Sequence, residues 1–230
     1  MNRTKLTCVL TVVVFGCPGL SFAAGAPAKG GGLVPLVLSY PKAVFKGTPP
    51  ELAEGTVVEP LSETEPAPIQ VAPGCVNLVS GIKPTTSDTN ASVQKLAKFT
   101  DGDKDPYETS IVLLRKGVQH VQFDLGGPAE LHAVVVWHAH DLVKFYRSVV
   151  VQIADDAAFT KNVRTLFNND TENLVGQGIG TDRQYFEQHW GKRIAAKGQK
   201  AQFVRLWSRG SSLGGLNEYT EVEVWGKPAK

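Results

Sequence analysis

The sequence is poor in cysteine, which limits the disulfide bonds that could stabilise its fold. Only three cysteines occur in 230 residues, and Cys8 and Cys17 lie in the N-terminal segment. Cys75 is therefore alone in the predicted folded part, and a secreted form has no intramolecular disulfide. No basic residue stands beside it to lower its pKa, so we interpret it as a small apolar residue rather than a reactive thiol. The core is expected to be stabilised by packing.

The sequence also lacks charge runs and the common catalytic motifs. Its net charge is +2, and acidic and basic residues are mixed along the chain, with no basic run. This argues against a nucleic-acid-binding surface. Neither G-x-S-x-G nor H-E-x-x-H is present. The glycine-rich stretch 176–180 does not match G-x-G-x-x-G, so a nucleotide site is not indicated.

Residues 1–23 have the pattern of a signal peptide. Arg3 and Lys5 precede the apolar run 6–15, and residues 21–23 (Ser-Phe-Ala) resemble a cleavage site. The run is too short to span a bilayer as a helix. Removal of the two basic residues takes the net charge from +2 to about zero (+2 − 2). We expect a secreted or cell-envelope protein, with no membrane span.

An alternative for the same segment is lipidation. Residues 14–17 (Val-Phe-Gly-Cys) resemble a bacterial lipobox, in which Cys17 would carry the lipid anchor. Phe15 and Pro18 fit that motif poorly. Both interpretations place the mature protein outside the cytoplasm.

Residues 24–74 form a Pro-rich linker or extended arm. Nine prolines and the Gly30-Gly31-Gly32 run indicate an extended conformation. A solvated spacer is the favoured interpretation. The alternative is that short apolar pieces, 33–38 and 57–58, pack along the domain surface.

Residues 75–228 are predicted to form the folded domain, and in most of it apolar residues recur at every second position. One short helix is predicted over 92–98, before this pattern begins. Turn residues at 126–128, 155–156 and 214–215 separate the segments. Short strands and frequent turns predict an all-β, eight-stranded jelly-roll sandwich. The expected apolar faces are Val121, Phe123 and Leu125; Leu131, Ala133, Val135 and Trp137; Val149, Val151 and Ile153; Phe203 to Trp207; and Val222 with Val224.

The loop Asp101-Gly102-Asp103-Lys104-Asp105 is rich in hard oxygen ligands. Carboxylates at alternate positions around a glycine can wrap a cation such as Ca²⁺. It is not an EF-hand, because Pro106 and Val112 replace the required glycine and glutamate. The alternative is a solvated turn in which Asp101 caps local amides.

Six motifs follow one another along the chain, at 77–85, 99–103, 121–126, 147–156, 203–206 and 221–226. Their order resembles that of the discoidin, or coagulation factor V/VIII type C, domains of the galactose-binding-like superfamily. The resemblance covers about two thirds of the chain and implies an eight-stranded jelly roll. Animal members commonly join the domain ends by a disulfide, and Cys75 has no such partner. The segment 168–192 is also long for this family, and is expected to be a surface loop with a strand fragment at Tyr185-Phe186.

The resemblance also implies a structural calcium ion between the acidic loop and the last strand. By position, Asp101 and Glu221 would supply carboxylate oxygens. The remaining oxygens would come from Lys98, Asp103 and either Thr109 or Ser110. Such an ion would tie two distant parts of a domain that has no disulfide.

Members of the family bind ligands through loops at one end of the sandwich. Sugars suit aromatic faces and planar polar groups. On this basis the candidate ligand-binding residues are His138, His140, Arg147, Asn217 and Tyr219. Tyr146 and Arg205 are expected to be structural.

His138 and His140 also have the H-x-H spacing of a zinc site, although no third ligand stands at a diagnostic distance. We therefore expect a non-catalytic extracellular module that binds carbohydrate or a cell-surface glycan. The alternative is a structural or protein-interaction module of a surface complex. A metal-dependent hydrolase is third.

Overall fold

The computed structural model describes residues 32–91 and 95–228. The predicted signal peptide, the lipidation site Cys17 and the first half of the predicted helix lie outside the described residues. The rest of that helix is a short 3-10 turn, η1 (Lys95–Phe99). No helix in the described ranges is long and apolar enough to cross a membrane.

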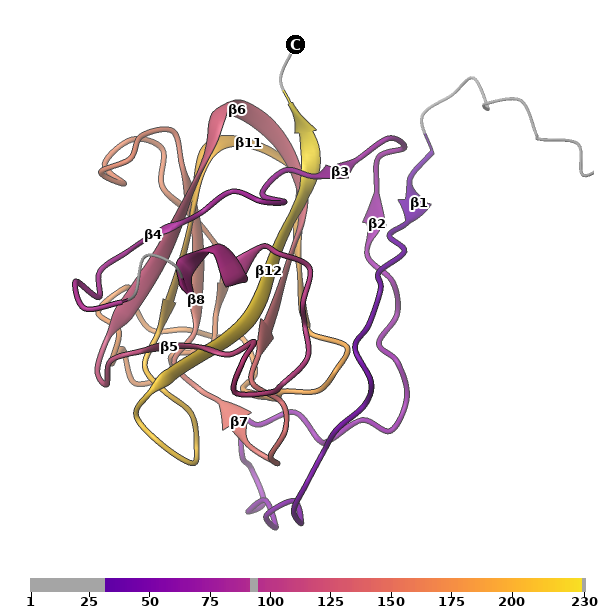
Figure 1. The fold of residues 1–230 in the computed structure, drawn as a ribbon, viewed down its shortest axis with the longest axis vertical. Helices are drawn as coiled ribbons and strands as arrows, with labels where there is room; N and C mark the ends of the chain where they lie inside the picture. The colour runs from indigo at the N-terminus through magenta and orange to yellow at the C-terminus, as the bar shows by residue number, and fades with distance from the viewer. Residues whose placement is uncertain (1–31, 92–94, 229–230) are drawn as a thin grey trace, which may run out of the picture. The chain divides into compact units, whose positions relative to one another are not determined.

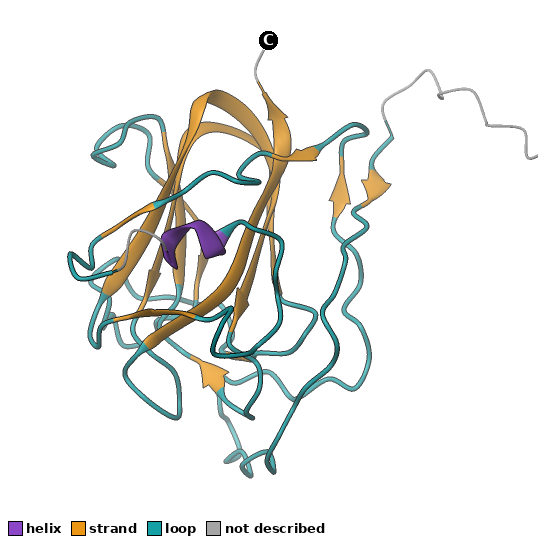
Figure 2. Cartoon of the chain, in the orientation of Figure 1, coloured by secondary structure: helices purple, strands orange, loops and turns teal. Residues whose placement is uncertain are grey.

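Strands make up almost all the regular structure of the described chain (Figures 1 and 2). Eight of them form one hydrogen-bonded sheet in the order β3-β12-β6-β11-β8-β9, with β4 on β6 and β5 on β12. This confirms the predicted all-β sandwich. The strands are β1 (Val34–Pro35), β2 (Gln70–Val71), β3 (Val76–Asn77), β4 (Thr85–Thr86), β5 (Val112–Leu114), β6 (Gln119–His138), β7 (Phe145–Tyr146), β8 (Val150–Ala154), β9 (Arg164–Asn168), β10 (Tyr185–Phe186), β11 (Lys192–Ser208) and β12 (Asn217–Pro228).

Two long strands, β6 and β11, each run through both layers of the sandwich. Residues 119–124 of β6 pair with 203–208 of β11 in one layer, and 129–136 pair with 192–201 in the other. Between these parts the strands arch over one end of the molecule, as Figure 1 shows. Gly126 (φ 76°) supplies left-handed backbone at the bend of β6, and Gly198 (φ 77°) does so at the register shift of β11 between Ala195 and Gln199. The sheet therefore folds onto itself and encloses the core.

The main core lies between the two layers. Val121 and Phe123 from one half of β6 meet Val134 and Val136 from the other half, and all four are fully buried. Tyr146 is also fully buried, as expected for a structural residue. The period-2 pattern of the sequence therefore identified the inward face of the first half of β6 correctly.

The second half of β6 is buried on both faces, which the sequence analysis did not predict. Ala133, Val135 and Trp137 point away from the main core and form a second cluster with Leu36 and Val71. A register shift separates Leu131, which stays in the main core, from Ala133. The predicted apolar face of this strand is thus split between two clusters.

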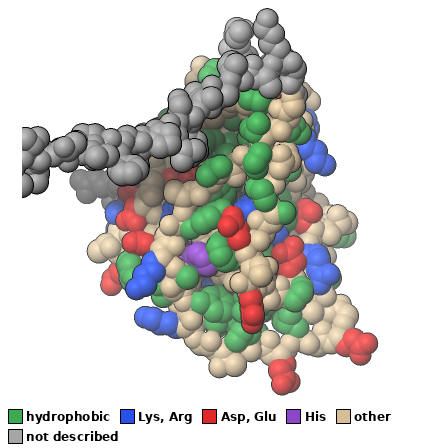
Figure 3. Space-filling view, turned by 90° about the vertical axis from the view of Figure 1, so that its right-hand side faces the viewer, with side chains coloured by type: hydrophobic (Ala, Val, Ile, Leu, Met, Phe, Trp, Pro, Cys, Tyr) green, Lys and Arg blue, Asp and Glu red, His purple; other side chains and the backbone are tan. Residues whose placement is uncertain are grey.

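The described part of residues 24–74 is an arm packed on the domain, so the spacer interpretation is wrong for it. β1 and β2 pair with each other, and Leu36 is only 8% exposed. The main chain of Lys46 and Glu59 bonds to residues of the domain. Figure 3 shows this side of the molecule, where hydrophobic, acidic and basic side chains are mixed.

The long segment between β9 and β11 also packs inward at its centre. β10 pairs with β7, as the expected strand fragment Tyr185-Phe186. Both side chains are buried, at 3% and 8% exposure. This part of the segment belongs to the domain's packing rather than to a free surface loop.

Candidate functional site

Three loops converge at the end of the sandwich opposite the arches of β6 and β11 (Figure 1). Antiparallel pairing of Ser208 with Gln119, and of Trp207 with Val150, places the end of β11 beside the starts of β6 and β8. We call this end the loop end, formed by residues 115–118, 147–149 and 209–216. Each loop carries an exposed basic residue that is in no ion pair among the described residues, Lys116, Arg147 and Arg209 respectively, while the exposed Arg115 of the first loop is paired with Asp88.

The three basic side chains line one open cleft, which we call the polar cleft. Its volume is about 430 Å³, and Ser211, Ser212 and the glycines of the third loop form part of its lining. No acidic residue lines it. Guanidinium, ammonium and hydroxyl groups all donate hydrogen bonds to oxygen, so this lining suits an oxygen-rich ligand.

A second cleft of about 370 Å³ adjoins the polar cleft and shares Lys116, Ser211 and Leu213 with it. We call it the leucine cleft, because Leu142, Leu213 and Leu216 line it. These leucines are 42%, 61% and 38% exposed. Glu218 lines this second cleft, where it pairs with Lys144. The loop end therefore combines polar donors with exposed apolar surface.

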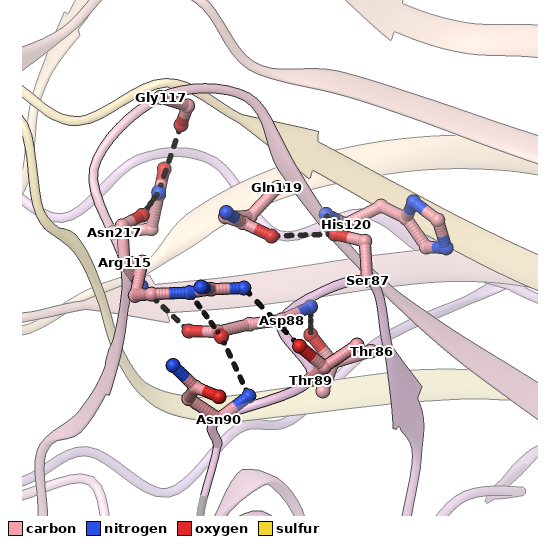
Figure 4. Close-up of polar contacts among 10 residues, drawn as sticks. All are labelled: Thr86, Ser87, Asp88, Thr89, Asn90, Arg115, Gly117, Gln119, His120 and Asn217. Carbon is pink, nitrogen blue, oxygen red and sulfur yellow. Dashed lines mark hydrogen bonds and ion pairs between the residues drawn. The ribbon is translucent and has the colours of Figure 1, made fainter.

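Asn217 fixes the loops that carry Lys116 and Arg209, as Figure 4 shows for the first loop. Its Nδ2 donates to the carbonyl oxygens of Arg115 and Gly117, at 2.7 and 3.1 Å. Its Oδ1 accepts from Ser208 Oγ and Gly210 N, at 2.7 and 2.9 Å. One buried amide thus holds the neighbours on both sides of both basic residues.

The loop of Arg147 is held in the same way by Asn169. This side chain is fully buried, donates to Tyr146 O at 2.9 Å and accepts from Val149 N at 2.8 Å. Asp88 adds a further anchor for the first loop, since it accepts from Arg115 N and Nε, both at 2.7 Å (Figure 4). Arg115 is therefore committed to Asp88 and does not enter the cleft lining.

Of the five predicted ligand-binding residues, the structure leaves only Arg147 at the surface. His138, His140 and Tyr219 are fully buried, and Asn217 is 1% exposed. The prediction that these four contact a ligand from solution is corrected, because burial closes them to it. Tyr219 Oη donates to Ser208 Oγ at 2.8 Å, so it helps to fix the same loop as Asn217.

The sequence analysis missed Lys116 and Arg209. Both stand in turn sequences between predicted strands, Arg-Lys-Gly and Ser-Arg-Gly. The sequence feature that could have indicated them is a basic residue directly before a glycine in each turn. It is weak, because most such lysines and arginines are solvated surface residues.

His138 and His140 are engaged with different partners in the interior. His138 Nδ1 lies 2.9 Å from Glu187 Oε2, and its ring stacks on Tyr146 with centroids 4.1 Å apart. His140 Nε2 lies 3.1 Å from Lys104 O. In the described ranges no three His, Cys, Asp or Glu side chains are grouped to hold a metal. This geometry does not favour the zinc-hydrolase interpretation.

The acidic loop and the last strand meet, on a different side from the polar cleft. Gly102 N donates to Glu221 Oε2 at 3.1 Å, and both residues line a cleft with Asp101. Asp103 is turned toward Ser110, whose Oγ donates to Asp103 Oδ2 at 2.5 Å. Asp101 Oδ1 accepts from Asp103 N at 3.0 Å, which is local turn capping. Lys98 lies at the end of η1 and Thr109 is exposed.

Glu221 is a buried carboxyl, 1% exposed. Burial raises its pKa to about 8, while the Gly102 N–H and Lys104 lower it and Glu223 and Asp101 raise it. Lys104 itself pairs with Glu223 at 2.7 Å. The chemistry fits a calcium ion in part: Asp101 and Glu221 line one cleft, which the Lys104 side chain also lines, and main-chain oxygens would have to complete the shell.

No family model matches the sequence, and a search of curated proteins finds no match. Solved structures of similar shape include a family 89 glycoside hydrolase from Clostridium perfringens, at 16% identity and a TM-score of 0.47. That match covers 67% of this chain and only 15% of the hydrolase.

Two binding modules are also similar. The chitosan-binding module 1 of a Paenibacillus sp. IK-5 chitosanase/glucanase matches at 18% identity and a TM-score of 0.46, over 66% of this chain and 99% of the module. A Streptococcus pneumoniae fucose-binding module matches at 17% and 0.43, over 65% and 96%. At these values the similarity carries no argument about function, which has to come from the site itself.

Proposed function

We propose that this protein is a non-catalytic extracellular module that binds carbohydrate at its loop end. The observation that carries the proposal is the union of the polar cleft with the leucine cleft. A sugar ring has hydroxyl groups at its edge and apolar C–H groups on its faces. Donors such as Arg147 and Ser211 suit the former, and the exposed Leu213 suits the latter.

The lining of the polar cleft supports binding rather than catalysis, and the carboxylate of Glu218 in the adjoining leucine cleft is paired with Lys144. The polar cleft has serine, lysine and arginine in its lining, but no carboxylate or histidine to act as a general base. A nucleophilic serine needs such a neighbour to activate it.

We infer that a structural metal ion would bind in the cleft that Asp101, Gly102 and Glu221 line, away from the loop end. Asp101 and Glu221 would hold Ca²⁺ there with main-chain oxygens of the acidic loop, which joins the loop to β12. The setting that suits this protein is the cell envelope or the extracellular medium, as the sequence of residues 1–23 indicates.

A protein partner is the second candidate for the loop end. The three exposed leucines favour it, because apolar side chains rimmed by polar groups are typical of interfaces. A glycan array separates the two. Saturable binding that is lost in Leu213→Ser and Arg147→Gln variants supports the carbohydrate proposal. No saturable binding to any glycan contradicts it.

A further inference from the structure

The charge of the polar cleft is unusual for a protein that is nearly neutral. Lys116, Arg147 and Arg209 all line it, and no acidic residue does. Among the described residues none of the three forms an ion pair. Elsewhere in the described chain, basic residues such as Arg164 and Lys192 are paired with acidic residues. The cluster is therefore local and is not a consequence of a basic composition.

The loops under the three cations are fixed by buried side chains. Like charges that face one cleft repel, and mobile loops would let them separate. Asn217 prevents this for Lys116 and Arg209, because it bonds to the residues that flank each of them. Asn169 does the same for Arg147. The main chain that carries the three cations is thus held in place before any ligand arrives, which lowers the entropy lost on binding.

We propose that the loop end selects acidic glycans, whose carboxylate or sulfate groups are bound by Lys116, Arg147 and Arg209. This inference rests on the proposed function and specifies its ligand class. Arginine offers paired donors that match the two oxygens of a carboxylate or sulfate. The hydroxyls of Ser211 and Ser212 remain for the sugar's own hydroxyl groups. Neutral sugars would leave the cation cluster uncompensated.

A glycan fits this site better than an anionic membrane. The cations line a concave cleft of about 430 Å³, into which a saccharide unit with its acid group can enter. A planar array of lipid headgroups would meet the rim, where Leu213 protrudes, and would not fill the cleft.

The test compares neutral dextran with dextran sulfate, which has the same backbone, and with polygalacturonate, which carries carboxylates on a different backbone. Binding of the full mature protein to dextran, dextran sulfate and polygalacturonate is measured by titration calorimetry at about 0.1 M salt, where the Debye length is about 10 Å. Arg147→Gln and Arg209→Gln each remove one positive charge and keep a polar side chain. Lys200→Gln removes an exposed charge from β11, at a distance from this cleft, and is the matched control. Vesicles of phosphatidylcholine with phosphatidylserine form a separate arm.

The expected result is that at least one acidic polysaccharide binds about ten-fold or more tightly than dextran. Each arginine variant should weaken that binding by about ten-fold, the contribution of one charge-assisted hydrogen bond. Lys200→Gln should leave it unchanged. Thermal unfolding checks that the variants are folded.

Four results would overturn the inference. Equal binding of dextran and the acidic polymers, with loss in the arginine variants, would refute acid selection and leave the proposed function standing. Equal weakening by Lys200→Gln would mean non-specific polyelectrolyte binding. Binding to the anionic vesicles alone would assign the site to a membrane. Binding of no polysaccharide would refute the proposed function as well.

Discussion

Gly102 donates its main-chain N–H to the Glu221 carboxylate across 3.1 Å, and this bond joins positions 119 residues apart. It connects the acidic loop to β12, the strand that pairs with β3, β5 and β6. The accepting carboxyl is almost completely buried, so its negative charge costs free energy there. A bound cation or a proton would each relieve that cost.

If calcium binds here, its removal should destabilise the protein. We expect a chelator to lower the melting temperature of the purified protein and added Ca²⁺ to restore it, because the ion binds only the folded form. Differential scanning calorimetry with and without chelator measures this. An unchanged melting temperature would leave the loop as a solvated turn held by the Gly102–Glu221 bond.

The Glu221→Gln variant localises that effect. It removes the charge of the proposed ligand but keeps its size, so the response to Ca²⁺ should disappear. Asp105→Asn is the control, since this residue is in the same loop and contributes only its main-chain N–H to Asp103. A calcium response that persists in Glu221→Gln and disappears in Asp105→Asn would place the ion elsewhere.

Asn217 should be important for stability although it touches no ligand. Asn217→Ala leaves the carbonyls of Arg115 and Gly117 without their donor and Ser208 Oγ and Gly210 N without their acceptor. We expect a loss of about 2–4 kcal/mol in the free energy of unfolding, because each buried group left unpaired costs about 1–3 kcal/mol and neighbouring effects are not additive. Urea unfolding measures it. A loss below about 0.5 kcal/mol, the usual range of surface substitutions, would show that the loops are held by other contacts.

The arm gives a test with an internal control at adjacent residues. Leu36 is 8% exposed against Val135 and Trp137, and Val37 is 83% exposed. Leu36→Ala should cost about 2–3 kcal/mol of stability, as buried leucines do, and Val37→Ala less than about 0.5 kcal/mol. Equal, small effects in urea unfolding would mean that the arm is not docked in solution.

The alternation of apolar and polar residues was sufficient to predict the strands of the fold, but it did not predict the residues of the candidate site. Alternation at Val121 and Phe123 predicts a strand with one buried face, because side chains alternate across a strand. The same rule cannot show that an arm 60 or more residues away covers the outer face at Val135 and Trp137. Proline content described the arm's extended shape correctly, while Leu36 and Val71 decide where it lies.

The candidate ligand residues show why site prediction failed where it did. Asn217 and Arg147 both stand at strand boundaries, and sequence does not tell whether such a side chain turns into the domain or out of it. The structure turns the amide inward, where four partners satisfy it, and the guanidinium outward. The convergence of Lys116, Arg147 and Arg209 depends on three loops that only the sheet topology brings together.

His120 gives a prediction about pH. Burial, and then the charge of Arg205, lowers its pKa from 6.5 to about 4. Its ring packs on Trp207 with centroids 4.5 Å apart, and its Nδ1 is buried without a partner among the described residues. Between these two pKa values the unfolded chain binds a proton that the folded protein does not. Stability should therefore fall as the pH is lowered from about 6.5 toward about 4.

His120→Phe isolates this contribution, because phenylalanine keeps an aromatic ring against Trp207 but does not titrate. The pKa of His189 is also lowered by burial, and its effect is the same in both proteins, so it cancels in the comparison. Urea unfolding at about pH 7 and about pH 5 should show a larger loss of stability in the wild type than in the variant. If the two lose the same amount, His120 is protonated as readily in the folded domain as in the unfolded chain, and its ring must be open to solvent.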